Sequence, residues 1–166
     1  ADDATLPLHV RHDGNLGALE TCGFAPLLDT VRALVAPLTA SLVGGDAAPR
    51  VSHAFVKRDH AARDERFRIH RDKSRVTINV CLTRTDDLCG STVSFFEDTY
   101  EQSAGLDAVK DADRDRLSLN DNDAAGAELF VLEHEAGVAC VHTGAQWHRT
   151  NATTRGTRSS LIVWCD

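Results

Sequence analysis

The chain has 166 residues, 42% of them hydrophobic, which is enough for a single domain, residues 1–166, with a sizeable core. Its formal net charge is −7 and its isoelectric point is near 5.5, which disfavours a protein that grips a nucleic acid backbone. No run approaches the roughly 18 apolar residues of a membrane span and no charged-then-apolar signal opens the chain, so we expect a soluble protein without a membrane span.

A polar stretch to about residue 23 is expected to be irregular, and an amphipathic helix is expected over about 24–43. Apolar residues recur there at spacings of three and four, and Gly44-Gly45 supplies a stop. The residues of the apolar pattern are Leu27, Leu28, Val31, Leu34, Val35, Leu38 and Leu42. We expect this helix to buttress a sheet.

Short runs of β-branched and apolar residues follow the helix, separated by turn residues. They predict strands near 51–57, 67–70, 75–84, 91–97, 128–133, 138–142, 145–149 and 158–165. About eight short strands with brief turns are typical of a jelly roll. The sequence therefore predicts a mainly β fold with a flanking helix, a cupin-like double-stranded β-helix.

His70 and Asp72 stand just before one of these strands. Residues i and i+2 on a strand project from the same face, so this imidazole and carboxylate can bind one metal ion. With a second imidazole from a distant strand, His148, they form a facial triad of two histidines and one carboxylate, which leaves positions on Fe(II) open. A His-x-Asp pair also occurs by chance, as a surface pair or a satisfied hydrogen bond. His142 is a rival to His148 as the second imidazole.

Two segments resemble the core of the Fe(II)/2-oxoglutarate-dependent dioxygenases, nearest to the prolyl and procollagen lysyl hydroxylase group. They are HRDKSRVTINVCL at residues 70–82 and HRTNATTRGTRSSLIVWC at residues 148–165. In the lysyl hydroxylases a similar His-x-Asp precedes a Thr-Ile-Asn strand, and a distal histidine stands ten residues before an arginine. The segment 52–58 is also similar to relatives of that group, and the resemblance covers roughly residues 24–100 and 128–165.

The resemblance implies that His70, Asp72 and His148 bind iron. It implies that Arg158 holds the distal carboxylate of 2-oxoglutarate, a role that suits a guanidinium because it binds a carboxylate through two hydrogen bonds. Ser160 shares a strand face with Arg158 and is expected to add a hydroxyl to that contact.

Asn79 is expected to offer an amide to the cosubstrate. The sequence departs from many relatives at Asp59, where they carry a tyrosine. Another hydroxyl such as Thr77 is then expected to substitute, or the cosubstrate sits differently.

The activity implied is hydroxylation of an unactivated carbon, on a prolyl or lysyl residue of a peptide or protein or on a free amino acid. The reaction would use Fe(II) as cofactor and consume 2-oxoglutarate and O2, with succinate and CO2 as coproducts. Ascorbate would be a further factor. Two alternatives stay open. A nucleic-acid oxygenase acting on methylated bases shares the His-Arg-Asp opening, but its ligand-to-arginine spacing is longer and nucleic acid is disfavoured by the charge. A non-catalytic, metal-binding jelly-roll module is the other.

The five cysteines show no paired spacing for a metal, and their odd number argues against a complete disulfide framework. We expect most to be small core or strand residues, while one bridge, such as Cys81 or Cys89 with a neighbour, stays open; a reducing cytoplasm is favoured. The polar, Asp-rich segment of about 98–126 is expected to be an inserted loop. An EF-hand reading fails there because Arg116 and Asn122 fall where glycine and glutamate are needed. Two interpretations of this loop are kept: a lid that recognises substrate, and a plain solvated loop.

Overall fold

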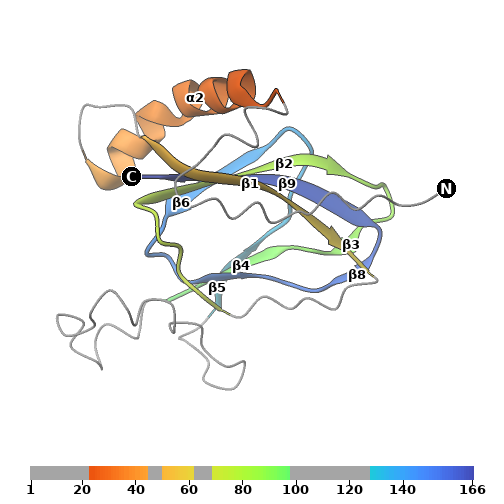
Figure 1. Cartoon of the computed structure of the whole chain (residues 1–166). Helices are drawn as coiled ribbons and strands as arrows, with labels where there is room; N and C mark the ends of the chain where they lie inside the picture. The colour runs from red at the N-terminus through yellow and green to blue at the C-terminus, as the bar shows by residue number, and fades with distance from the viewer. Residues whose placement is uncertain (1–22, 45–49, 62–68, 98–127) are drawn as a thin grey trace.

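The computed structural model describes residues 23–44, 50–61, 69–97 and 128–166 (Figure 1). One helix and nine strands form this part of the chain. They are α2 (Ala25–Val43), β1 (Val51–His60), β2 (Val76–Arg84), β3 (Cys89–Gly90), β4 (Val93–Phe96), β5 (Glu128–Leu132), β6 (Ala139–Thr143), β7 (His148–Thr150), β8 (Thr153–Arg155) and β9 (Thr157–Cys165). The predicted fold class, mainly β with a flanking helix and jelly-roll-like, is confirmed.

The strands form antiparallel sheets. The large sheet has the order β1-β9-β2-β6, a second sheet has the order β5-β4-β7, and β3 pairs with β8. Figure 1 shows α2 lying over one face of the large sheet, with β4 and β5 below its other face. The face of the large sheet that points away from α2 therefore lines the interior between the two larger sheets.

Alternation along the strands gives the large sheet two different faces. On β2, the buried Val76, Ile78 and Val80 form one core cluster with Leu161 and Val163 of β9. The helix completes this cluster with its buried residues Leu28, Val31 and Val35. Because neighbouring residues on a strand point to opposite faces, Thr77, Asn79, Arg158 and Ser160 point away from the helix.

The predicted helix is confirmed to within a residue. A proline lies in its first turn, where its missing N–H costs no hydrogen bond, and Gly44 ends it with a positive φ of 72°. By length and composition the helix could cross a membrane, which the sequence analysis did not expect. Its buried residues Leu28, Val31 and Val35 pack on the sheet, while Leu34, Leu38 and Leu42 stay exposed.

Two predicted strands differ from those of the structure, and two short strands were not predicted. The expected strand at 67–70 is, in its described part, an isolated bridge at His70. The strand expected at 145–149 begins only at His148, because a turn precedes it. Two-residue β3 and three-residue β8 are additional strands in segments expected to be turns. The expected irregular N-terminus to residue 22 and the inserted loop at 98–126 lie outside the described residues.

The four described cysteines, Cys81, Cys89, Cys140 and Cys165, are free thiols. The bridge from Cys81 or Cys89 that the sequence left open is therefore not formed. Burial raises the pKa of Cys140 and of Cys165 to about 11, so both are unreactive at neutral pH.

Candidate metal centre

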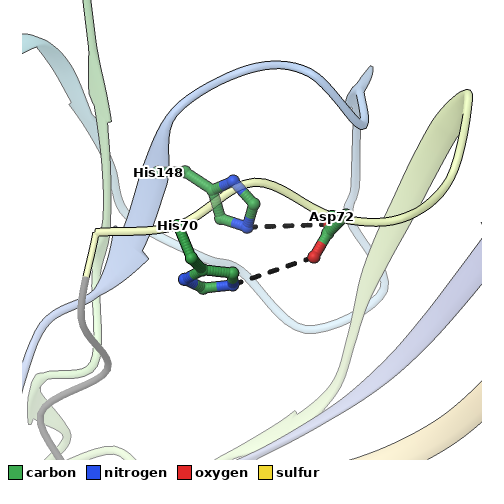
Figure 2. Close-up of side chains that lie close together, drawn as sticks. All are labelled: His70, Asp72 and His148. Carbon is green, nitrogen blue, oxygen red and sulfur yellow. Dashed lines mark ion pairs between the residues drawn. The ribbon is translucent and has the colours of Figure 1, made fainter. Parts of the chain in front are cut away.

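Three side chains predicted as metal ligands meet at one end of the interior. His70 lies in the segment that leads into β2, Asp72 follows it, and His148 is the first residue of β7. The Nε2 atom of each imidazole lies 3.7 Å from a different carboxylate oxygen of Asp72. Figure 2 shows both rings directed at this carboxylate. One ligand atom from each of the three residues lies within 4.8 Å of the others.

Backbone pairing across 78 residues of sequence brings the two histidines together. His70 and His148 exchange both backbone hydrogen bonds, at 2.9 and 3.0 Å. The preceding residues, Ile69 and Trp147, are buried in a second small core with Phe96. Since successive side chains alternate, burying Ile69 and Trp147 turns both imidazoles to the opposite side. The ring centroids are 4.4 Å apart.

Hydrogen bonds orient two of the three side chains, His148 and Asp72. Nδ1 of His148 lies 2.9 Å from the carbonyl oxygen of Gln146, so Nδ1 carries the hydrogen and Nε2 presents its lone pair to the site. Thr77 donates its hydroxyl hydrogen to Oδ2 of Asp72 at 2.5 Å. A hydroxyl has a single hydrogen, so the 2.8 Å contact between Ser74 and Thr77 must have Ser74 as donor. A relay from Ser74 through Thr77 therefore holds the carboxylate.

The electrostatics suit a cation. Burial lowers the pKa of His148 to about 3, Asp72 opposes this effect, and the neighbouring His70 and His142 lower the pKa further. His148 is therefore neutral at physiological pH, the form that binds metals. Two histidines and one aspartate match the donor set that Fe(II) takes in facial triads. Ligand atoms bound to one ion lie at most about 4 Å apart, so the 3.7 Å separations fit with small side-chain adjustments.

His142 lies beside this cluster but not in it. Its ring centroid is 4.7 Å from that of His148, and its Nδ1 is 2.9 Å from the carbonyl oxygen of Thr143. Burial lowers its pKa, so it is neutral as well. His142 is opposite Thr77 in the β2–β6 pair, on the face that points away from the helix. The structure thus groups His148, and not the rival His142, with His70 and Asp72.

Arg158 is a buried cation on the same face of the large sheet. Only 1% of its surface is exposed, and Nη2 donates to Oδ2 of Asp59 at 3.0 Å. Among the described residues, its Nε and Nη1 have no hydrogen-bond partner, and neither do Oγ of Ser160 and Oδ1 of Asn79. Buried donors without acceptors are costly, so the nitrogens of Arg158 and the hydroxyl of Ser160 suit a ligand with acceptor oxygens. Oδ1 of Asn79 is itself an acceptor and does not suit such oxygens. The cosubstrate roles of Arg158, Ser160 and Asn79 stay predictions.

Thr77 has a different contact from the one predicted. The sequence analysis offered its hydroxyl to the cosubstrate in place of a tyrosine. In the structure the hydroxyl hydrogen is already donated to Asp72. Thr77 is thus placed to orient a metal ligand, and its direct contact with a cosubstrate stays a prediction.

Asp59, where the sequence departs from many relatives, is bound by two cations. Lys57 Nζ lies 2.8 Å from its Oδ1 and Arg158 Nη2 lies 3.0 Å from its Oδ2. Burial alone would raise the pKa of Asp59, but Lys57 and Arg158 outweigh it and hold the pKa below its ordinary value. Sequence reasoning missed Lys57 altogether. The i, i+2 spacing of Lys57 and Asp59 was the signal that could have found it, because this spacing places both side chains on one face of β1.

Comparison with known proteins adds independent evidence. No family profile matches the chain. It is similar to two Arabidopsis thaliana proteins, the 2-oxoglutarate and iron-dependent oxygenase domain-containing proteins ICU11, with 28% identity over 113 residues, and CP2, with 32% identity over 114 residues. These matches support the oxygenase superfamily predicted from the motifs. Each covers 68% of the chain and 24% of the relative, so the chain spans about a quarter of these proteins. Neither name specifies a prolyl or lysyl hydroxylase.

Proposed function

We propose that the chain is an Fe(II)- and 2-oxoglutarate-dependent dioxygenase that hydroxylates an unactivated carbon, on a prolyl or lysyl residue of a peptide or protein. The observation that carries the proposal is the pairing of two sites in one interior. Three ligand atoms converge at His70, Asp72 and His148, and the buried Arg158, two of whose nitrogens have no partner in the described part of the chain, faces the same interior. The similarity to two proteins named as oxygenases of this kind supports the same cofactors.

Iron with 2-oxoglutarate would supply oxygen activation, with decarboxylation of the 2-oxo acid to succinate and CO2. The residues of the chain supply position. His70, Asp72 and His148 hold the ion on one side and leave its other positions to exogenous ligands. The hydrogen bonds from Ser74 to Thr77 and from Thr77 to Asp72 would hold the carboxylate in position for the ion.

Arg158 would bind the far carboxylate of 2-oxoglutarate. The unpartnered Nε and Nη1 provide donors, and the buried surroundings strengthen each hydrogen bond because little water competes. Ser160, two residues further on the same face, would add its hydroxyl. This arrangement favours a 2-oxo diacid over a 2-oxo monoacid.

The test is production of succinate from 2-oxoglutarate under oxygen, with Fe(II) and ascorbate present. We expect turnover by the wild-type protein and none by Asp72→Ala or His148→Ala, because each variant removes one ligand. His60→Ala and Asp86→Ala change the same residue types outside the cluster and should keep activity. Normal turnover by the two ligand variants would refute the metal site.

The substrate class is tested separately with a peptide library scored by mass spectrometry for the gain of one oxygen atom. Hydroxylation confined to peptides with proline or lysine supports the proposal. Oxidation of methylated bases in an oligonucleotide would favour the nucleic-acid alternative, which the net charge of −7 disfavours. Metal binding without succinate formation from any substrate would indicate a non-catalytic module.

A further inference from the structure

We propose that Lys57 is a second cationic anchor for the far carboxylate of 2-oxoglutarate, tied to Arg158 through Asp59. This inference rests on the proposed function and deepens it, because it names a specificity-determining residue of the same site.

Strand register brings the participating side chains together. Asp59 on β1 is paired with Arg158 on β9, and Lys57 is paired with Ser160. Paired residues in an antiparallel sheet point to the same face, and so do residues two apart on one strand. Lys57, Asp59, Arg158 and Ser160 therefore form one patch on the face of the sheet that points away from α2. The hydrogen bonds of 2.8 and 3.0 Å to Asp59 join the two cations within this patch.

Lys57 also reaches across the interior to the second sheet. Its Nζ donates to Oγ1 of Thr150 at 3.1 Å. Thr150 is two residues after His148 on β7, and thus about 7 Å along the same strand. The ammonium therefore lies between the strand that carries a metal ligand and the strand that carries Arg158. In 2-oxoglutarate the two carboxyl carbons are about 5 Å apart when the chain is extended. A molecule with its 2-oxo acid end at the metal can place its far carboxylate beside this ammonium.

Lys57 and Arg158 bring two cations to a poorly exposed patch. The side chains of Lys57, Arg158 and Asp59 are only 13%, 1% and 9% exposed, respectively. Little water competes there, so both cations would attract an incoming carboxylate. The nearby His134 contributes no charge of its own, since burial, aided by Arg158, lowers its pKa to about 4.

The unpartnered nitrogens of Arg158 are an independent sign that an acceptor belongs here. Asp59 uses Nη2 alone, while Nε and Nη1 are buried without a partner among the described residues. Asp59 thus orients the guanidinium without saturating it. A carboxylate that reaches these nitrogens also comes close to Lys57, because Asp59 joins the two cations.

The test compares two ligands that differ only at the far end. Binding of 2-oxoglutarate and of 2-oxopentanoate, which lacks the far carboxylate, is measured by calorimetry on Mn(II)-loaded protein without oxygen. For Lys57→Gln we expect the Kd of 2-oxoglutarate to rise roughly 10- to 100-fold, the size of a lost hydrogen bond between charged groups. The Kd of 2-oxopentanoate should stay within about twofold.

Arg58→Gln is the matched control. It removes the same charge from the next residue of β1, whose exposed side chain points to the opposite face, and should change neither Kd. Thr150→Val keeps the ammonium but removes the hydroxyl that positions it, and should raise the Kd of 2-oxoglutarate alone by about threefold. If thermal unfolding shows that Lys57→Gln is not folded, the Kd values of Thr150→Val are used in its place.

The outcomes separate this inference from the proposed function. An unchanged Kd of 2-oxoglutarate in folded Lys57→Gln, or an equal loss for both ligands, would overturn the role of Lys57. In either case wild-type binding of 2-oxoglutarate leaves the proposed function standing. Failure of the metal-loaded wild-type protein to bind 2-oxoglutarate would instead refute the proposed function, and the inference with it.

Discussion

The hydroxyl of Thr77 is expected to control metal affinity, although Thr77 is not a ligand. It is 2% exposed, donates to Asp72 at 2.5 Å and accepts from Ser74 at 2.8 Å. Thr77→Val keeps the shape of the side chain and its β-branched form, which suits β2, but removes both contacts. The carboxylate of Asp72 then loses the donor that fixes its orientation.

The magnitude follows from the type of contact. A hydrogen bond to a charged group contributes about 1.5 to 3 kcal/mol, which is roughly 10- to 100-fold in an equilibrium constant. Loss of the partner that orients a metal ligand reduces metal affinity by a similar factor. We therefore expect the Kd of Mn(II) or Fe(II) to rise at least about tenfold in Thr77→Val.

Calorimetric titration of the metal-free protein, with urea unfolding to check the fold, measures this effect. Thr83→Val is the matched control, because Thr83 lies on the same strand but is exposed. Thr77→Ser retains the hydroxyl and should bind metal nearly as well as the wild type. If Thr77→Ser and Thr77→Val lose affinity equally, or if Thr77→Val loses none, the relay does not orient Asp72.

Three further predictions concern the surroundings of the site. Gly144→Ala should lower metal affinity more than about tenfold in the same titration, because an added Cβ would overlap the backbone of Ser74 and displace the segment that carries Asp72; unchanged affinity would contradict this. Asp59→Asn should reduce the free energy of unfolding of the metal-free protein by about 3 kcal/mol in urea, because it removes the carboxylate charge that pairs with the poorly exposed Lys57 and Arg158; exposed Asp86→Asn should change it little. His134 has a folded-state pKa of about 4 and an ordinary pKa near 6.5, so the unfolded state binds the proton more readily between these values. Stability should therefore fall as pH falls through that window, by up to about 3 kcal/mol, and His134→Gln should flatten this decline in urea midpoints measured from pH 7 to pH 4.5.

The choice between His148 and His142 shows where sequence reasoning needs support. Both follow apolar, strand-like runs near the C-terminal end, and only the ten-residue spacing to Arg158 favoured His148. The structure adds a physical reason. The backbone of His148 pairs with that of His70, whereas His142 on β6 pairs with Thr77 on β2. Backbone pairing between distant segments leaves no trace in local composition.

Local patterns were sufficient for the helix and most strands, and together with the family resemblance they predicted the three residues that the structure groups, His70, Asp72 and His148. Alternation of apolar and polar residues marks strands and their faces, and the i, i+2 spacing places His70 and Asp72 on one side of the chain. The β9 sequence predicted Arg158 and Ser160 on one face for the same reason. The short strands β3 and β8 were not predicted, because two or three residues give no readable period.

The sequence by itself determined the element types, the sheet faces and the residue types able to bind Fe(II) and a carboxylate, because these depend on neighbours a few residues apart. Only the tertiary structure decided which polar partner each of them has. Thr77 donates to Asp72 because the segment before β2 folds back, and Asp59 joins Lys57 to an arginine 99 residues away because β1 pairs with β9. Such partners are chosen by strand register. Register is set by how the apolar faces of all the strands pack together, which no single segment encodes.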